Sequence, residues 1–273
     1  MPAADMAMVA REPDGPVPAT LQRLVVAWQN PDERGIQPVG FLTYDGLLYR
    51  FAYIRHALGV ADFRPLLGFP DLQGSYSSPD LFPLFAQRAM DPRRPDYQRY
   101  VARLGLEGEP GPWEQITRSQ GRRQGDTIQL FPEPTSHGDE LTCLFLVHGI
   151  RHAHEGDRLE GGWIRGTPEQ VNAALGSLRP GDPLQLAPDL RNRFNELAVM
   201  VVGSSVPVGW VPDLLLEDLH RLRERSAITA SVEHVNGPDA PVHLRLLVRL
   251  AAIPAGDFRF FTGQRWEPLV LQG

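Results

Sequence analysis

Lysine is absent from this sequence of 273 residues: the 27 basic residues other than histidine are all arginine. The absence excludes functions that need a lysine side chain, such as phosphate binding by a P-loop, Schiff-base chemistry or ATP positioning in a kinase. Cysteine is nearly absent too, because Cys143 is the only one. A lone cysteine makes no disulfide within the chain, so we expect a reducing compartment, the cytoplasm. The apolar neighbours of Cys143 predict a core position rather than a nucleophile.

Long apolar runs and strong positive charge are also missing. No stretch approaches the roughly 20 apolar residues of a membrane-spanning helix, so we expect no membrane partner. Residues 1–20 are rich in alanine and proline without a signal-peptide pattern, and they predict a flexible tail. The formal net charge of -6 argues against a protein that coats duplex DNA through bulk electrostatics. A small site of a few arginines and aromatic rings is compatible with that charge.

The alternation of short apolar runs with turn residues predicts a β-rich α+β protein of two domains. Residues 21–135 predict a small domain that mixes strands with short helices, although the Gly-, Pro- and Ser-rich stretch Leu66–Ser78 predicts a loop. Residues 140–253 predict short strands at close spacing with one or two helices, which is typical of a small closed or half-open β-barrel. Residues 254–273 remain as a C-terminal extension.

Some elements of the second domain have clear signals for their bounds. Leu141–Ile150 is the most apolar predicted strand, and Val242–Ala251 is predicted to be one of two longer antiparallel strands. Thr167 is a predicted N-cap with Pro168 at the first helical position. Asp213 is predicted to cap the amphipathic helix that follows it.

Three stretches of the second domain carry a resemblance to a known family. They are His148–Ala153, the pair Leu184–Leu186 and Asn192–Val199, and Pro207–Pro212 ahead of the capped helix. In this order they resemble the motifs of a HIRAN domain, and the resemblance covers about Leu141–Ala252. The resemblance implies an OB-like barrel that grips the unpaired 3′ end of a DNA strand.

The resemblance also implies roles for individual side chains. Arg151 would bind phosphate, for which its forked guanidinium is suited, and His152 and Phe194 would stack on bases. Asn195 stands where the family often has Asp, and it would accept a hydrogen bond from a terminal 3′-hydroxyl without adding negative charge. Trp210 takes the place of a ring residue, with a core position as the alternative. The nucleic-acid-binding set predicted in this way is Arg151, His152, Asn192, Arg193, Phe194, Asn195 and Trp210.

Two segments qualify the resemblance. Residues 155–180 replace a short loop of the family and contain Arg158, Trp163 and Arg165, which suggests a lid. In the first domain, VGFLTYDGLLYRFAYI, LFPLFAQRAM and RPDY resemble the small N-terminal subdomain of HipA-like toxin kinases. The catalytic part and the ATP-positioning lysine of those kinases have no counterpart here. That resemblance therefore implies binding of a protein partner, as an antitoxin or adaptor does, and no kinase activity.

The sequence leaves two alternatives open. In a metal-dependent hydrolase, His148, His152 and His154 would face one side of a strand, with Glu155 and Asp157 nearby. No H-E-x-x-H or C-x-x-C motif completes such a site, so we expect no enzyme, metal or cofactor. In a protein-interaction module, the rings would be core and the arginine would form a salt bridge. The expected function is recognition of single-stranded DNA or a DNA 3′ end, in repair, replication-fork handling or defence against foreign DNA.

Overall fold

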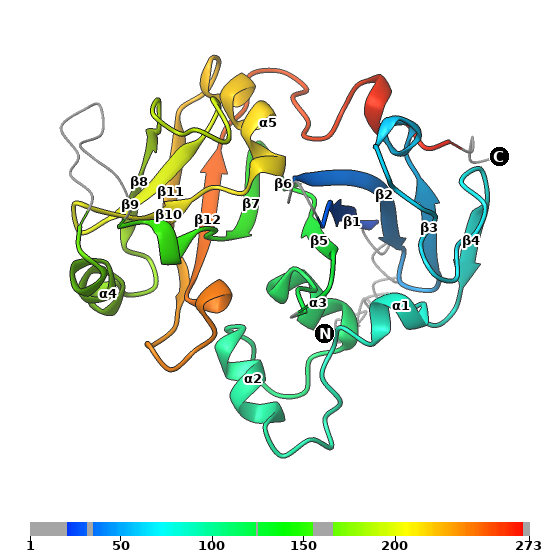
Figure 1. Cartoon of the computed structure of the whole chain (residues 1–273), viewed down its shortest axis with the longest axis horizontal. Helices are drawn as coiled ribbons and strands as arrows, with labels where there is room; N and C mark the ends of the chain where they lie inside the picture. Colours follow the sequence, from blue (N-terminus) through cyan, green and yellow to red (C-terminus); the bar gives the residue numbers. More distant parts are fainter. Residues whose placement is uncertain (1–20, 32–34, 124, 155–165, 270–273) are drawn as a thin grey trace, which may run out of the picture.

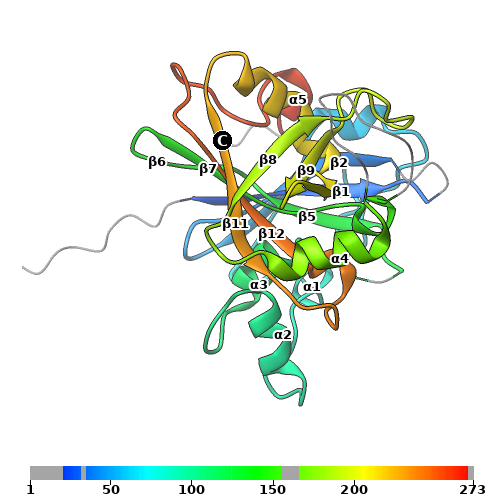
Figure 2. The same cartoon turned by 90° about the vertical axis from the view of Figure 1, so that its left-hand side faces the viewer.

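The computed structural model describes residues 21–31, 35–123, 125–154 and 166–269. Within these ranges the chain forms two antiparallel sheets with five α-helices, which confirms the β-rich α+β class. Figure 1 shows the two sheets beside each other, and Figure 2 shows helix α4 lying across the second sheet. No described helix is long and apolar enough to cross a membrane.

The first sheet has five strands in the order β4-β3-β2-β1-β5. Its strands are β1 (Gln22–Gln29), β2 (Ile36–Tyr44), β3 (Tyr49–Tyr53), β4 (Ser75–Ser78) and β5 (Ile128–Pro132), and its helices are α1 (Pro83–Ala86), α2 (Tyr97–Arg103) and α3 (Pro112–Ser119). The loop predicted over Leu66–Ser78 is wrong at its end, because its last four residues are β4 and pair with β3. This strand is a short, solvent-exposed edge with no apolar run to mark it.

The second sheet has seven strands in the order β10-β9-β8-β11-β12-β7-β6. Its strands are β6 (Thr135–His137), β7 (Glu140–Leu146), β8 (Pro183–Pro188), β9 (Val199–Gly203), β10 (Val206–Trp210), β11 (Ile228–Val235) and β12 (Leu246–Ala252). The remaining helices are α4 (Pro168–Ser177) and α5 (Asp213–Arg223), with 3-10 helices η1 (Arg55–Gly59), η2 (Ile150–His152), η4 (Val242–Leu244) and η5 (Gln264–Trp266).

A backbone bridge joins the segment after β7 to β10, the edge strand at one end of this sheet. His148, just beyond β7, exchanges two hydrogen bonds of 2.9 Å with Trp210 at the end of β10. Gly149 then turns the chain with a φ of +67°, and a Cβ there would lie 2.6 Å from the Trp210 ring. At Gly209, where φ is +152°, a Cβ would lie 2.5 Å from the His148 carbonyl oxygen. Both positions therefore require glycine.

Three sequence-based boundaries need correction. The strand predicted to reach Ile150 ends at Leu146, because the Gly149 turn leads into η2. The strand predicted from Val242 begins four residues later, since Pro241 leads the chain into η4. Asp213 is the first helical residue of α5 rather than its cap.

The N-terminal signal of α4 is confirmed. Thr167 is the N-cap, and its Oγ1 accepts a bond of 3.3 Å from the backbone N–H of Gln170. The Gln170 side chain in turn accepts a bond of 2.8 Å from the backbone N–H of Thr167. Pro168 occupies the first turn. The pair of reciprocal bonds satisfies two amide groups that a helix start otherwise leaves open.

The two sheets share one apolar core. Val25, Phe41 and Phe131 of the first sheet belong to the same buried cluster as the leucines of α5 and the inner residues of β7, β9 and β12. The predicted C-terminal extension takes part as well: Trp266 is buried in this cluster, and the backbone N–H of Leu269 donates to the carbonyl of Tyr53 at 2.9 Å. The division into two domains at residues 135–140 stays a prediction. Residues from both sides of that boundary pack together in the shared buried cluster.

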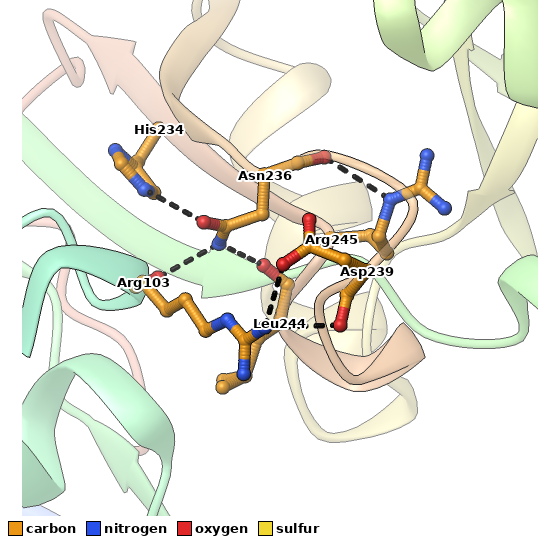
Figure 3. A network of polar contacts seen from close by, with 6 residues as sticks. All are labelled: Arg103, His234, Asn236, Asp239, Leu244 and Arg245. Atoms are coloured by element: carbon orange, nitrogen blue, oxygen red, sulfur yellow. Dashed lines mark hydrogen bonds and ion pairs between the residues drawn. The ribbon is translucent and has the colours of Figure 1, made fainter. Parts of the chain in front are cut away.

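A polar network also joins the parts on another side (Figure 3). The Asn236 amide nitrogen donates to the carbonyl oxygens of Arg103 and Leu244, each at 2.7 Å. The buried Arg245 donates from its Nε to the Asn236 carbonyl at 3.1 Å, and Arg103 pairs with the Asp239 carboxylate at 2.7 Å. The end of α2 is therefore fixed to the loop between β11 and β12.

Candidate nucleic-acid interface

The most exposed aromatic side chain of the described residues lies in the segment 189–197, which we call the Phe194 loop. Phe194 is 99% exposed. Its backbone is nevertheless fixed, because Asn192 Oδ1 accepts bonds from the N–H groups of Phe194 at 3.0 Å and Asn195 at 3.1 Å. Arg191 and Arg193 on the same loop are both exposed. A hydrogen-bonded loop thus presents an exposed aromatic ring directly after two exposed arginines.

Asn195 anchors the far side of the Phe194 loop. Its Nδ2 donates to Asp213 Oδ1 at 3.0 Å, and its Oδ1 accepts from the backbone N–H of Leu197 at 3.0 Å. An amide oxygen has two lone pairs, so one acceptor position of Asn195 remains for a hydroxyl. The side chain is half-buried and held against the start of α5. Asn195 is therefore a positioning residue that keeps limited capacity to contact a ligand.

A buried carboxylate that the sequence did not reveal connects Trp210 to this loop. Asp189 is 1% exposed, and its Oδ2 accepts bonds from Trp210 Nε1 at 2.9 Å and from Asn192 Nδ2 at 3.3 Å. The half-buried Trp210 ring also packs against the shared core. The only sequence signal for Asp189 is its place as an acidic residue between the stretches Leu184–Leu186 and Asn192–Val199.

Arg151 and His152 lie in η2, just past the bridge that joins His148 to Trp210. Both side chains are exposed, whereas the neighbouring Ile150 and Ala153 are buried in the shared core. Among the described residues, Arg151 pairs with no carboxylate. The structure thus connects the three predicted motifs: the first to the third through the backbone bridge, and the second to the third through Asp189.

The strand on which the metal alternative depended is not formed. Because β7 ends at Leu146 and η2 follows, His148, His152 and His154 do not share the face of one strand. Loss of hydration, with smaller contributions from Arg122 and His243, lowers the pKa of His148 to about 3. No group of three or more His, Cys, Asp or Glu residues gathers as a metal site within the described ranges.

Parts of two sequence hypotheses lie outside the described residues. Glu155 and Asp157 of the metal alternative belong there, as do the arginines and the tryptophan of the suggested lid. Of the 155–180 segment, the structure describes residues from Gly166 onward, which include α4.

Cys143 is confirmed as a core residue. Its side chain is buried in β7, and burial raises the pKa of the thiol to about 12. A thiol with that pKa carries almost no thiolate at neutral pH, and the thiolate is the nucleophile. Cys143 therefore contributes packing to the second sheet.

A surface depression of about 310 Å³ lies away from these motifs. It is lined by Arg55 and His56 of η1 and by Arg265 of η5. Both arginines already have carboxylate partners, Glu267 at 3.0 Å and Glu217 at 2.5 Å. The depression follows from the way the C-terminal segment returns to the first sheet.

Comparison with known proteins gives one structural similarity. No protein-family model matches the chain, and no curated protein matches it in sequence. Among solved structures, the chain is similar to the crystal structure of the HIRAN domain of human HLTF, with 14% sequence identity and a TM-score of 0.26. The similarity covers 41% of this chain and 72% of that chain. A TM-score of this size does not establish a shared fold, so the family of the chain is not assigned from it.

Proposed function

We propose that this protein binds single-stranded DNA, with preference for a 3′ end, through the Phe194 loop together with Arg151 and His152. The observation that carries the proposal is the fully exposed Phe194 ring on a hydrogen-bonded loop that also carries the exposed Arg191 and Arg193. Leaving a phenylalanine in water forgoes about 1.5–3 kcal/mol of burial free energy. A nucleic-acid base recovers that free energy by stacking, while guanidinium groups bind the phosphates beside it.

We propose further that the second sheet is a half-open, OB-like barrel. The bridge between His148 and Trp210 supports this idea, because it joins β10 at one edge of the sheet to the segment after β7, which pairs with the opposite edge strand β6. A groove across such a barrel is a common place for single strands to bind. Helix η2 follows the bridge directly, and the Phe194 loop is tied to Trp210 through Asp189, which would set both on one rim of the groove.

In this proposal each side chain has a distinct role. Arg151 binds a phosphate, Phe194 and His152 stack on bases, and Asn195 offers its remaining lone pair to a terminal hydroxyl. Trp210 holds the loop through Asp189 rather than touching DNA. Because Asn195 is uncharged, it does not repel a 3′-phosphate. An aspartate at the same position would repel it. Strand-end recognition of this kind suits repair, replication-fork handling or defence against foreign DNA.

The test compares binding of the full-length protein to a fluorescent single strand with a free 3′ end, the same strand with a blocked 3′ end, and blunt duplex. We expect the free-ended strand to bind best and blunt duplex to bind worst. Phe194→Ala should weaken single-strand binding about 5- to 150-fold, since stacking is worth about 1–3 kcal/mol per base. Leu47→Ala is the control, because Leu47 is 81% exposed on the first sheet. Equal effects of the two variants would overturn the proposal.

One observation favours the alternative of a protein-interaction module. Leu190 is 63% exposed and Leu197 is 39% exposed, so the Phe194 loop also offers an aliphatic surface. Exposed apolar patches of this kind are typical of protein interfaces. Salt distinguishes the two functions, because a strand held by phosphates dissociates steeply as salt rises and an apolar protein contact does not. In the same alternative, the first domain would bind a protein partner through a surface of its own.

A further inference from the structure

The segment after α3 reaches from the first sheet to the bridge region of the second. Gln120, 1% exposed and with a φ of +54°, turns the chain there. Its carbonyl accepts a bond of 2.8 Å from the backbone N–H of Leu130 on β5. Its Oε1 lies 3.4 Å from Nε2 of His148. The buried Nε2 of Gln120 has no hydrogen-bond partner among the described residues.

Two arginines from different parts of the chain surround this junction. The half-buried Arg122 follows Gln120 by two residues, and the exposed Arg151 comes from η2, which packs against η4. Loss of hydration first, then Arg122 and then Arg151, lowers the pKa of His243 on η4 to about 4. Arg122 also helps to lower the pKa of His148. Burial, with smaller contributions from these arginines, keeps both imidazoles neutral at pH 7.

Such a cluster has the chemistry of a phosphate site. Guanidinium groups supply both positive charge and paired donors for phosphate oxygens. The Phe194 loop, with its own two arginines, is joined to the same region through Asp189, Trp210 and the His148 bridge. A strand that leaves the Phe194 loop past Arg151 would next meet Arg122.

We propose that Arg122 is a second phosphate contact, so that the bound single strand runs from the second sheet across His148 and His243 onto the first sheet. The inference rests on the proposed function and extends its footprint to a segment outside the HIRAN-like region. The ligand chemistry is the phosphodiester backbone, which is read without regard to base sequence. Arg122 would therefore add affinity equally for all sequences.

The experiment measures the affinity of the full-length protein for a fluorescent oligothymidylate strand over a series of salt concentrations. Arg122→Gln should weaken binding on the order of tenfold at low salt and reduce the slope of log affinity against log salt by about 0.7, the value for one phosphate of a single strand. Arg123→Gln is the matched control, because Arg123 is the exposed neighbour and its loss changes the net charge equally. Arg122→Lys keeps the charge and should restore the wild-type slope, which a merely structural role would not require.

The outcomes separate the two proposals. If the wild-type protein fails to bind the strand, the proposed function is wrong and this inference falls with it. If Arg151→Gln reduces the salt slope while Arg122→Gln and Arg123→Gln behave alike, only the present inference is wrong. Thermal unfolding of each variant identifies any loss of folding. If Arg122→Gln is unfolded, the salt slope of Arg122→Lys decides whether the charge at position 122 contacts the strand.

Discussion

The indole N–H of Trp210 donates to the buried carboxylate of Asp189 at 2.9 Å, and the same oxygen takes a second bond from Asn192. One carboxylate oxygen therefore ties the end of β10 to the loop that presents Phe194. Exposure of the phenylalanine does not require a loose loop, because the hydrogen bonds that fix its backbone lead back to the core of the second sheet.

Trp210→Phe tests this tie. The variant keeps an aromatic ring but removes the N–H, so we expect the free energy of unfolding to fall by about 1–3 kcal/mol as Asp189 loses a donor. Urea unfolding followed by far-UV circular dichroism measures the loss. Combined with Asp189→Ala, the double variant should lose less than the sum of the single losses, since both single changes remove the same bond. Additive losses would show that the bond contributes nothing.

His148 and His243 should make the protein less stable in mild acid. Their pKa values fall to about 3 and about 4 in the folded chain, against 6.5 for an ordinary histidine, chiefly through loss of hydration. Between pH 6.5 and 4 the unfolded chain binds more protons than the folded chain. The stability that the two neutral histidines allow is therefore complete above pH 6.5 and declines as the pH drops towards 4. Unfolding free energies measured across this range should show a smaller decline in His148→Gln. His137→Gln, at an exposed position on β6, serves as the control. A wild-type stability that does not change between pH 6.5 and 4 would contradict the prediction.

Asp126→Asn should destabilise the first sheet strongly. The Arg88 side chain is fully buried, and its Nη2 lies 2.5 Å from Asp126 Oδ2. Without the carboxylate a buried cation remains unpaired, which costs about 3–5 kcal/mol. The asparagine oxygen can still accept the bond from the backbone N–H of Ile128, so the loss reports on charge. In Asp91→Asn, an exposed ion pair with Arg93 is lost, and the change should be within about 0.5 kcal/mol. Similar unfolding midpoints for the two variants would refute the expectation.

Asn236→Ala should weaken the connection between α2 and the second sheet. Two bonds of 2.7 Å are lost, to the carbonyls of Arg103 and Leu244, and each is worth about 0.5–1.5 kcal/mol. Asp239→Asn breaks only an exposed ion pair with Arg103 and should cost about 0–1 kcal/mol. Differential scanning calorimetry compares the variants. A smaller loss for the alanine variant than for Asp239→Asn would rule out the proposed connection.

Local signals in the sequence predicted a large part of the fold. Apolar runs identified the inner strands, and Thr167 with Pro168 located the start of α4. Helix α3 was missed although it has Pro112 at its first position and a Glu114 side chain that accepts the backbone N–H of Gly111 at 2.9 Å. The Gly- and Pro-rich residues around that start are equally typical of a turn, so the sequence alone does not distinguish a helix cap from a linker there.

The candidate site was predictable in its residues but not in its connections. A pattern of motifs pointed to Arg151, Phe194 and Trp210, yet the exposure of a side chain depends on the packing of distant segments. Asp189 bonds to a tryptophan 21 residues away, and Gln120 meets His148 across 28 residues. No propensity or spacing rule identifies such pairs, because they exist only once the sheets have formed.

The return of the C-terminal segment to β3 has a consequence for how the chain folds. The Arg55 side chain donates to the carboxylate of Glu267, which lies 212 positions further along the chain. The backbone N–H of Arg55 also donates to the carbonyl of Glu267. During synthesis these contacts must wait until Glu267 and Leu269 have left the ribosome. Contacts of such large sequence separation slow folding, so refolding from denaturant should be slow for a chain of this size, with closure of the terminal segment among its last steps.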